Sequence, residues 1–247
     1  MRIFLCVLAL SVISHFASAQ FCCTKEGTML FYSKHDASKG VTSVDSVKII
    51  EVKNQSNALR VLYYNFTPEN QKTYSEVSKC LDCELFVYHK ASQITDHYYM
   101  SEQLFKEAMI KQSNRRVSCK NSNQTKEKNT ELDPIFKIKG DLKISLSNKF
   151  TTGTPITDCQ FNYKVGILNM KMGITKAKYL GIETIKTPAG TFRCQKISYQ
   201  SKAKVMLLSG KADLTEWYAE GIGLVKREER NTKGKLQESF ELMKIRN

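Results

Sequence analysis

Two cysteines and two histidines in the middle of the chain are the residues best suited by type to metal or redox chemistry. Cys80 and Cys83 form a C-x-x-C pair in "CLDC", and His89 and His97 follow it. A redox pair of this kind opens a helix, where the thiol pKa falls, whereas this pair runs into the strand-like segment "ELFVYH". The H-x7-H spacing of the histidines also exceeds the roughly three to five residues usual in zinc sites. The spacing therefore favours structural disulfides over either chemistry.

Catalytic motifs are missing from the sequence. It contains no G-x-S-x-G nucleophile elbow and no H-E-x-x-H metalloprotease motif. Of the histidines beyond residue 19, His35 falls in a predicted turn, and His97 directly precedes a predicted helix that it or Asp96 could cap. These patterns predict a protein that is not an enzyme and that uses no metal and no cofactor.

Residues 1–19 have the pattern of a signal peptide. An apolar run covers residues 3–13 after a basic second residue, and Ala17-Ser18-Ala19 is an A-x-A cleavage site. Phe21 precedes Cys22 where lipoprotein signals carry a small residue, so we expect cleavage after Ala19 and no lipid anchor. No later stretch approaches the ~20 apolar residues that a membrane-spanning helix needs. The pattern predicts an exported protein, periplasmic or extracellular, without a transmembrane segment.

Seven cysteines remain after cleavage, and an exported chain meets an oxidising compartment in which disulfides are usual. Because seven is odd, at least one thiol stays free or pairs between chains. We predict that most of these cysteines are disulfide-bonded. They are Cys22, Cys23, Cys80, Cys83, Cys119, Cys159 and Cys194.

The charge of the chain favours anionic partners. The full chain has 38 basic and 24 acidic residues, a formal net charge of +14, and loss of Arg2 leaves 37 basic residues and +13. Such a surplus attracts phosphate groups, acidic glycans or anionic lipids, or serves only to keep the surface soluble. The lysines alternate with apolar residues in "NYKVGILNMKMGITKAKYLG" and form no compact basic block. We therefore predict no nucleic-acid binding, and a strand with one apolar and one basic face.

Strand patterns dominate the mature chain. β-Branched and aromatic runs are separated by turn sequences such as "DASKG", "KNQSN", "KTPAGTF" and "RNTKGKL". One helix is predicted at residues 99–112, with Ser101 as N-cap, and a polar loop follows at residues 120–134. Its apolar face consists of Leu104, Phe105, Ala108 and Met109. The prediction is an all-β, mainly antiparallel fold: a single domain at residues 20–247, with a helix and loop insertion at about residues 92–134.

The segment "TEWYAEGIGLVKREER" contains the only tryptophan, Trp217, beside Tyr218 and shortly before Gly221 and Gly223. A phosphate-binding glycine loop needs a helix N-terminus after it, and here a basic strand follows instead. Glycines within strands mark bends or the close passage of another segment. We interpret the segment as a sheet corner, and a role in a cavity wall stays open alongside it.

Two motifs near the C-terminal end resemble those of the TapB-like family of exported bacterial proteins of unknown function, found chiefly in Bacteroidetes. One is the turn and strand "TPAGTF", and the other is "WYAEGIG"; we take both to be structural. Their characteristic residues here are Thr187, Pro188, Gly190, Phe192, Trp217, Tyr218, Gly221 and Gly223.

The resemblance implies an antiparallel, curved β-roll or half-barrel, similar in architecture to LolA-like lipoprotein carriers. It implies no activity. It also implies a disulfide between Cys80 and Cys194, and we place Cys22 or Cys23 with Cys83 as the next pair.

Two functions of different kinds remain open. The first is a binding protein that holds an amphipathic, anionic, lipid-like ligand in a cavity of the curved sheet. The second is an envelope protein that docks a partner through sheet edges and basic faces, without a small ligand. For the first function we expect two apolar stretches to line the cavity, through Ile167, Met170, Met172, Ile174, Met206 and Leu208.

Overall fold

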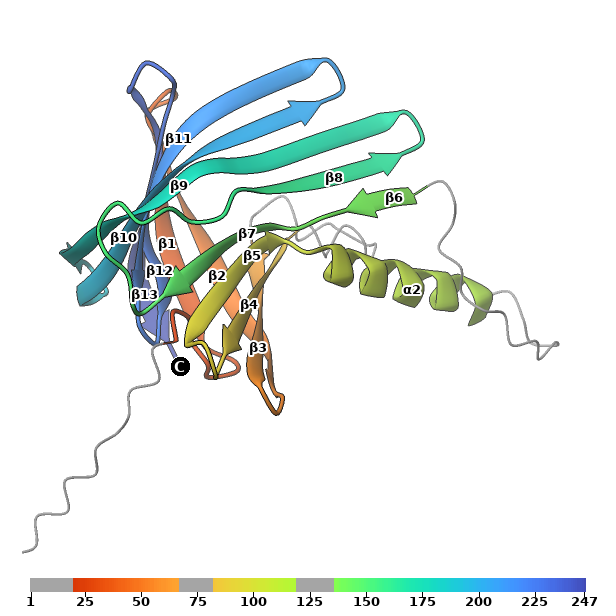
Figure 1. Ribbon diagram of the computed structural model, residues 1–247, viewed down its shortest axis with the longest axis horizontal. Helices are drawn as coiled ribbons and strands as arrows, with labels where there is room; N and C mark the ends of the chain where they lie inside the picture. The colour runs from red at the N-terminus through yellow and green to blue at the C-terminus, as the bar shows by residue number, and fades with distance from the viewer. Residues whose placement is uncertain (1–19, 67–81, 119–135) are drawn as a thin grey trace, which may run out of the picture.

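The computed structural model describes residues 20–66, 82–118 and 136–247. Figure 1 shows a strongly curved sheet with one helix, α2 (Glu102–Ser118), projecting from its side. The strands are β1 (Met29–Asp36), β2 (Val41–Asn54), β3 (Ala58–Phe66), β4 (Cys83–His89), β5 (Ile94–Met100), β6 (Phe136–Lys139), β7 (Leu142–Ser147), β8 (Cys159–Val165), β9 (Leu168–Thr187), β10 (Gly190–Val205), β11 (Leu208–Ala219), β12 (Gly223–Arg230) and β13 (Leu236–Arg246). The predicted signal peptide, the polar loop at residues 120–134, Cys80 and Cys119 lie outside the described residues.

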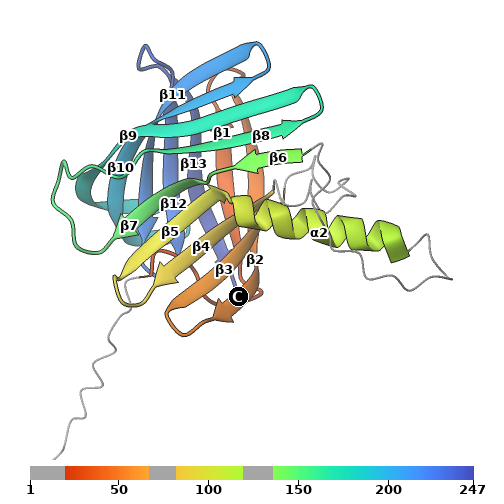
Figure 2. The same cartoon turned by 45° about the vertical axis from the view of Figure 1, so that its right-hand side comes forward.

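All these strands belong to one sheet, in the order β6-β8-β9-β10-β11-β12-β13-β1-β2-β3-β4-β5-β7. Neighbouring strands pair antiparallel, and β13 lies beside β1, so the C-terminal strand pairs with the first one. The sheet coils into a half-barrel, as Figures 1 and 2 show from two sides. The predicted all-β, antiparallel half-barrel with one helix in the middle of the chain is confirmed.

The two edges of the sheet come from one short piece of chain. β6 pairs with β8 and, after a turn at Gly140, β7 pairs with β5 at the other end of the sheet. Gly140 has a φ of 85°, and a Cβ there would lie 2.3 Å from the carbonyl oxygen of Gln160. Only glycine fits this approach, because both the backbone conformation and the space exclude a side chain. Gly140 thus permits the change of partner strand.

Side chains cover the free edge of β7. The backbone N–H of Lys143 donates to Sγ of Cys159, and this thiol donates to the Lys143 carbonyl, both at 3.3 Å. The Tyr179 hydroxyl accepts from the N–H of Ser147 at 2.9 Å and donates to the carbonyl of Ser145 at 2.8 Å. An uncovered strand edge invites pairing with another chain, and these bonds remove that opportunity along β7.

Alternation along the strands separates a concave core face from a convex face. Phe161, Met172 and Ile174 share one face of the β8–β9 hairpin, and Lys164 and Lys171 share the other. Phe161 and Ile174 are buried, whereas both lysines are exposed, so the predicted apolar and basic faces of this segment are confirmed. The concave core is continuous across the sheet and includes Leu30, Ile49, Val61, Phe86, Ile144, Leu146, Ile197 and Leu242.

Helix α2 begins three residues later than predicted and extends beyond the predicted end. Ser101 precedes it as expected: its carbonyl accepts from the N–H of Phe105, and Oδ1 of Asp141 accepts from the N–H of Glu102 at 2.9 Å. A carboxylate at a helix N-terminus is favourable, because the free amides there carry partial positive charge. The predicted apolar face packs inward, with Phe105 against the ring of Phe161. No helix of residues 20–66, 82–118 and 136–247 is long and apolar enough to cross a membrane.

The segment with the tryptophan is a hairpin turn rather than a bend within a strand. β11 and β12 are joined through Gly221, with φ 72°, and β12 starts at Gly223, with φ 101°. The N-terminal segment passes under this turn: the Gly221 N–H donates to the Gln20 carbonyl at 2.7 Å, and a Cβ on Gly223 would lie 3.5 Å from the Phe21 carbonyl oxygen. The expected close passage of another segment is therefore present at Gly223.

The other motif residues occupy structural positions as well. Thr187 ends β9 and its Oγ1 accepts from the N–H of Ala189, while Pro188 is exposed in the turn and Gly190 starts β10 with φ 143°. Trp217 is buried on the convex side, where its Nε1 donates to Glu183 at 2.9 Å and its ring contacts Lys196 and Lys226. Strand alternation thus turns the Trp217 side chain away from the N-terminal segment that contacts Gly223.

Candidate functional site

A network of buried and half-buried ionisable side chains lies on the concave face. We call it the polar cluster; it consists of Glu84, His97, Tyr99, Glu216, Tyr218 and Arg227. They come from β4, β5, β11 and β12, which the curvature of the sheet brings to face one another (Figure 2). The cluster joins opposite walls of the half-barrel.

Glu216 is the centre of the polar cluster. It is fully buried, and its Oε1 accepts from Nε of Arg227 at 2.6 Å. Its Oε2 accepts from the hydroxyls of Tyr99 at 2.6 Å and Tyr218 at 2.8 Å. Burial lowers the pKa of Arg227, but the combined attraction of Glu216 and of the neighbouring Tyr199, Tyr99 and Glu84 exceeds that effect and holds this pKa well above its ordinary value. The Glu216 carboxylate thus has a donor at each oxygen, and one of these donors is the Arg227 guanidinium.

His97 extends the polar cluster toward β4. Its Nδ1 lies 2.8 Å from the Tyr218 hydroxyl, and its Nε2 donates to Glu84 at 2.8 Å. Its ring stacks on Phe86 with 4.0 Å between centroids. Burial alone would raise the pKa of Glu84. The attraction of His97 and Arg227 exceeds this effect, so the pKa lies below its ordinary value.

The capping role suggested for His97 is wrong. His97 lies inside a strand and does not cap α2, because β5 continues to Met100. His89 bonds to Asp96 at 3.2 Å, whereas His97 bonds to Glu84 on the other side of the sheet. The two rings therefore do not converge. Among the described residues, no three His, Cys, Asp or Glu side chains gather as metal ligands would.

A separate groove of about 590 Å³ runs between α2 and strands β2, β3 and β4. Leu62 and Tyr64 line it from the sheet and point away from the core residues Val61 and Tyr63, as strand alternation requires. Its apolar lining consists of Ile50, Leu62, Tyr64, Cys83, Leu85, Leu104, Ala108 and Ile110. The groove is thus mostly apolar and reaches the surface beside the helix, where Ile50 and Ile110 are exposed.

Charged side chains form the rim of this groove. Lys53 pairs with Glu51 at 2.8 Å, and Glu107 accepts from Gln103. Within the described parts of the chain, Arg60 and Lys111 have no carboxylate partner. The rim therefore offers two uncompensated positive charges beside an apolar channel, which suits a ligand with an apolar tail and an anionic head.

A second charged surface covers the convex side of β6 and β8–β11; we call it the lysine face. Three lysine pairs lie directly opposite each other across neighbouring strands: Lys137 with Lys164, Lys171 with Lys204, and Lys202 with Lys211. None of these lysines forms an ion pair with any residue that the structure describes. Like charges placed opposite each other on a sheet destabilise it.

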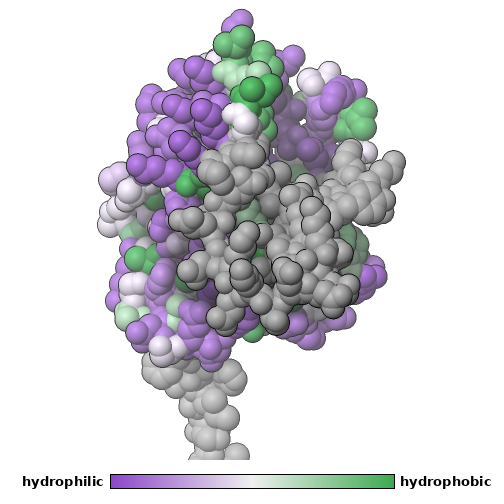
Figure 3. Space-filling model, turned by 90° about the vertical axis from the view of Figure 1, so that its right-hand side faces the viewer, coloured by the Kyte–Doolittle hydropathy of each residue, from purple (hydrophilic) through white to green (hydrophobic). Residues whose placement is uncertain are grey.

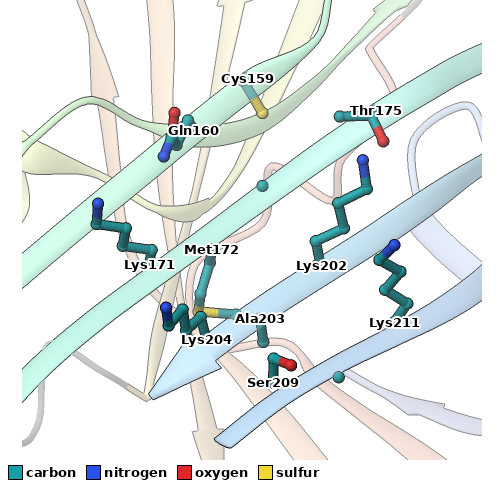
Figure 4. Close-up of a pocket in the computed structure, with 12 residues that line it drawn as sticks. Cys159, Gln160, Lys171, Met172, Thr175, Lys202, Ala203, Lys204, Ser209 and Lys211 are labelled. Carbon is teal, nitrogen blue, oxygen red and sulfur yellow. The ribbon is translucent and has the colours of Figure 1, made fainter. Parts of the chain in front are cut away.

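Figure 4 shows the central part of the lysine face. Lys171, Lys202, Lys204 and Lys211 surround a hollow of about 530 Å³, to which Met172 also contributes. The lysines come from three adjacent strands, so the register of the hairpins, not a loop, fixes their spacing. The arrangement presents a flat array of ammonium groups that anions can bridge.

The residues that we expected to line a cavity divide into two groups. Ile174 is buried in the core, and Met170 and Met172 pack partly against it. Ile167, Met206 and Leu208 are 89%, 50% and 79% exposed, so the prediction that they line a cavity is wrong. The reason is turn placement: two-residue hairpin turns fall at Gly166–Ile167 and at Met206–Leu207, which puts these side chains at strand ends.

The cysteine prediction is also corrected. The thiols of Cys22, Cys23, Cys159 and Cys194 are free, so the proposed pairs Cys80–Cys194 and Cys22 or Cys23 with Cys83 do not form. The thiol of Cys159 is hydrogen-bonded to the backbone of β7. Burial is the main reason why the pKa of Cys22 and that of Cys194 are raised to about 12. Buried thiols with such pKa values remain protonated and unreactive at neutral pH.

Sequence reasoning missed the polar cluster and the groove. Glu216 and Arg227 were visible as hairpin partners across the Gly221 turn, and a glutamate between Leu214 and Tyr218 on a buried face was a usable signal. The contacts of Tyr99 and His97 with β11 span more than a hundred residues of chain, and nothing local predicts them.

Comparison with known proteins gives a family and a fold. The DUF3108-like family model matches residues 92–242. The structure resembles a candidate lipoprotein from Parabacteroides distasonis, with TM-score 0.60, 17% identity and coverage of 92% of this chain and 99% of that one. It also resembles a candidate exported protein with a YmcC-like fold from Bacteroides fragilis, with TM-score 0.62, 17% identity and coverage of 93% and 100%. No curated protein matches the chain.

Proposed function

The chain belongs to the DUF3108-like family, and from that premise we propose that it is an exported protein that binds an amphipathic, lipid-like ligand and catalyses no reaction. Export is supported by the signal-peptide pattern and by the two similar proteins, of which one is a candidate lipoprotein and the other a candidate exported protein. The likeness to LolA-like carriers that the sequence suggested is part of this proposal. It agrees with a half-barrel and an associated helix.

The groove beside α2 carries the proposal. Its lining is aliphatic and aromatic, and its volume is within the range of roughly 300–1,000 Å³ usual for small-molecule sites. Arg60 and Lys111 lie at its rim, where they can pair with a phosphate or carboxylate while the tail occupies the channel. The polar cluster does not suit such a ligand, because its groups already bond to one another.

The envelope-docking alternative is supported less well. It requires sheet edges that can pair with a partner, and at one of the two edges, β7, side chains of Cys159, Tyr179 and Gln195 already bond to the backbone. Basic faces remain available for docking, but they do not explain an apolar groove next to a helix.

Titration with a fluorescent fatty-acid analogue and a fluorescent phospholipid analogue tests the proposal. Ala108→Trp fills the groove from α2, and we expect it to weaken binding by roughly tenfold or more, because the channel loses its volume. Val44→Trp is the matched control, since Val44 is 56% exposed and lies outside the groove. Arg60→Glu should weaken binding at low salt more than at high salt, because salt screens the rim charge.

Two outcomes would reject the groove. One is the absence of saturable binding of both analogues by folded protein. The other is binding that Ala108→Trp and Val44→Trp reduce equally, since a specific channel would be sensitive only to the first.

A further inference from the structure

Exposed aliphatic side chains gather at two neighbouring hairpin tips. The tips are residues 166–168, between β8 and β9, and residues 205–208, between β10 and β11. They carry six of the twelve large hydrophobic side chains that are most exposed in the described chain: Ile167, Leu168, Val205, Met206, Leu207 and Leu208. The tips are adjacent, because the Met206 N–H donates to the Asn169 carbonyl at 2.8 Å. Figure 3 shows hydrophobic surface at the upper rim of this side of the molecule.

The second tip is costly in two ways. Leu207 is 94% exposed, and Met206 adopts a φ of 55°. Two-residue hairpin turns that need positive φ favour Asn or Gly, which are also polar or small. Here both turn positions carry large apolar residues. Met206 is strained by its positive φ, and Leu207 exposes apolar surface to water. Such a choice is understandable where the tip enters an apolar medium.

The lysine face begins directly behind the tips. Lys164 precedes Ile167 by three residues, and Lys204 precedes Leu207 by three. At ~3.3 Å per residue, their backbones lie roughly 10 Å behind the ends of the hairpins. Interfacial segments bury their apolar groups by about 5–10 Å in a bilayer, which would bring these ammonium groups to the level of the lipid phosphates.

We propose that the two hairpin tips insert into the surface of an anionic lipid bilayer while the lysine face binds its headgroups. The three opposed lysine pairs repel one another in the free protein, and anionic headgroups between them would remove that repulsion. The tips and α2 project toward the same side of the half-barrel in Figure 1. A docked protein would therefore have the groove on the side that faces the membrane.

A bilayer fits these observations better than a second copy of the chain. In a symmetric pair that buries the tips side by side, each lysine face would meet another lysine face, and the charges would add. Nucleic acid would match the charge but not the aliphatic tips, because bases stack on aromatic or guanidinium planes. An anionic bilayer supplies both an apolar layer for the tips and phosphates for the lysines.

Flotation with vesicles tests the proposal on the mature protein. We expect binding to vesicles that contain phosphatidylglycerol, and binding weaker by roughly tenfold or more to phosphatidylcholine alone or at high salt. The double variant Ile167→Asp with Leu207→Asp removes the apolar tips and should lower binding at least tenfold. The double variant Val41→Asp with Val44→Asp is the matched control, since these residues are 55% and 56% exposed on β2 and should not affect binding.

Two further measurements complete the test. Lys171→Glu with Lys204→Glu should abolish the preference for anionic vesicles, and Leu207→Trp should shift its emission to the blue only when vesicles are present. Equal effects of the tip and control variants, or equal binding to neutral and anionic vesicles, would overturn the proposal. Loss of a dimer in Leu207→Asp, measured by light scattering without vesicles, would do so as well, because a second copy would then be the occupant. The groove titration is separate, since tip variants leave its lining unchanged.

Discussion

On the concave side of β11, Glu216 is fully buried and both of its carboxylate oxygens accept hydrogen bonds. On the convex side of the same strand, Lys211 lies opposite Lys202, and neither has a carboxylate partner in the described structure. Five residues of chain separate these two arrangements of charge. One satisfies its charges within the molecule, and the other leaves them for something outside it.

The difference separates what stabilises the fold from what is available for function. A buried ion pair compensates its desolvation only when the geometry is good and the charged atoms are hydrogen-bonded, as both carboxylate oxygens of Glu216 are. The groups of the polar cluster are therefore committed to one another. In the lysine face, opposed lysines repel one another, and at the hairpin tips aliphatic side chains are exposed to water. In our proposal, binding of a partner removes both of these costs.

Substitution in the polar cluster should have the largest effect on stability. Glu216→Gln keeps the size of the side chain but leaves Arg227 without its counter-charge on the concave face. We expect a loss of roughly 3–5 kcal/mol in the free energy of unfolding, measured in urea. Glu220→Gln, an exposed position on the same hairpin, is the control and should change little. A loss below about 1 kcal/mol for Glu216→Gln would mean that water reaches the cluster and the comparison fails.

Substitutions of two glycines compare the two ends of the β11–β12 hairpin: Gly223 lies next to the turn that joins the strands, and Gly210 lies near the far end of β11. Gly223 has φ 101° and lies against the Phe21 carbonyl, whereas Gly210 has open space around it. Gly223→Ala should cost roughly 1–3 kcal/mol, because alanine is strained in that conformation. Gly210→Ala should be neutral or slightly stabilising, because it only restricts the unfolded chain. Equal melting temperatures for the two variants would contradict the positive φ at Gly223.

Much of this fold could be read from the sequence, because the signals are local. Turn residues placed the hairpins at Pro188 and Gly234, and periodicity placed Phe105 and Ala108 on the buried side of the helix. Apolar character alone was misleading at Ile167, Met206 and Leu208, since neither tip has the usual turn residues on both central positions. Compartment was misleading for the cysteines, because an oxidising environment permits disulfides but does not bring thiols together. Contacts between distant strands had no local signal.

The free energy of unfolding at acidic pH should depend on the ionisation of Glu84. Its pKa is lowered in the folded protein, since the attraction of His97 and Arg227 exceeds the effect of burial. A depressed carboxyl pKa stabilises the fold above the ordinary value of about 4.3, and that contribution is lost as the pH falls through the lower folded value. The difference in unfolding free energy between the native protein and Glu84→Gln should therefore shrink below about pH 4.3. A difference that grows on acidification would show that Glu84 is neutral in the fold.

The smallest effect that we predict has the opposite sign and belongs to the lysine face. Lys202→Glu converts the opposed pair with Lys211 into an attractive one, so the free energy of unfolding should rise by roughly 0.2–1 kcal/mol at low salt. Lys34→Glu is the control, because Lys34 already pairs with Glu238 at 3.0 Å, and its reversal should destabilise the protein by a similar amount. Both effects should fade at high salt. If Lys202→Glu destabilises as Lys34→Glu does, the lysine face is already compensated within the molecule, and the contrast between the two sides of β11 disappears. If it stabilises the fold and at the same time weakens binding to anionic vesicles, the lysine face gives up stability for attachment to a surface.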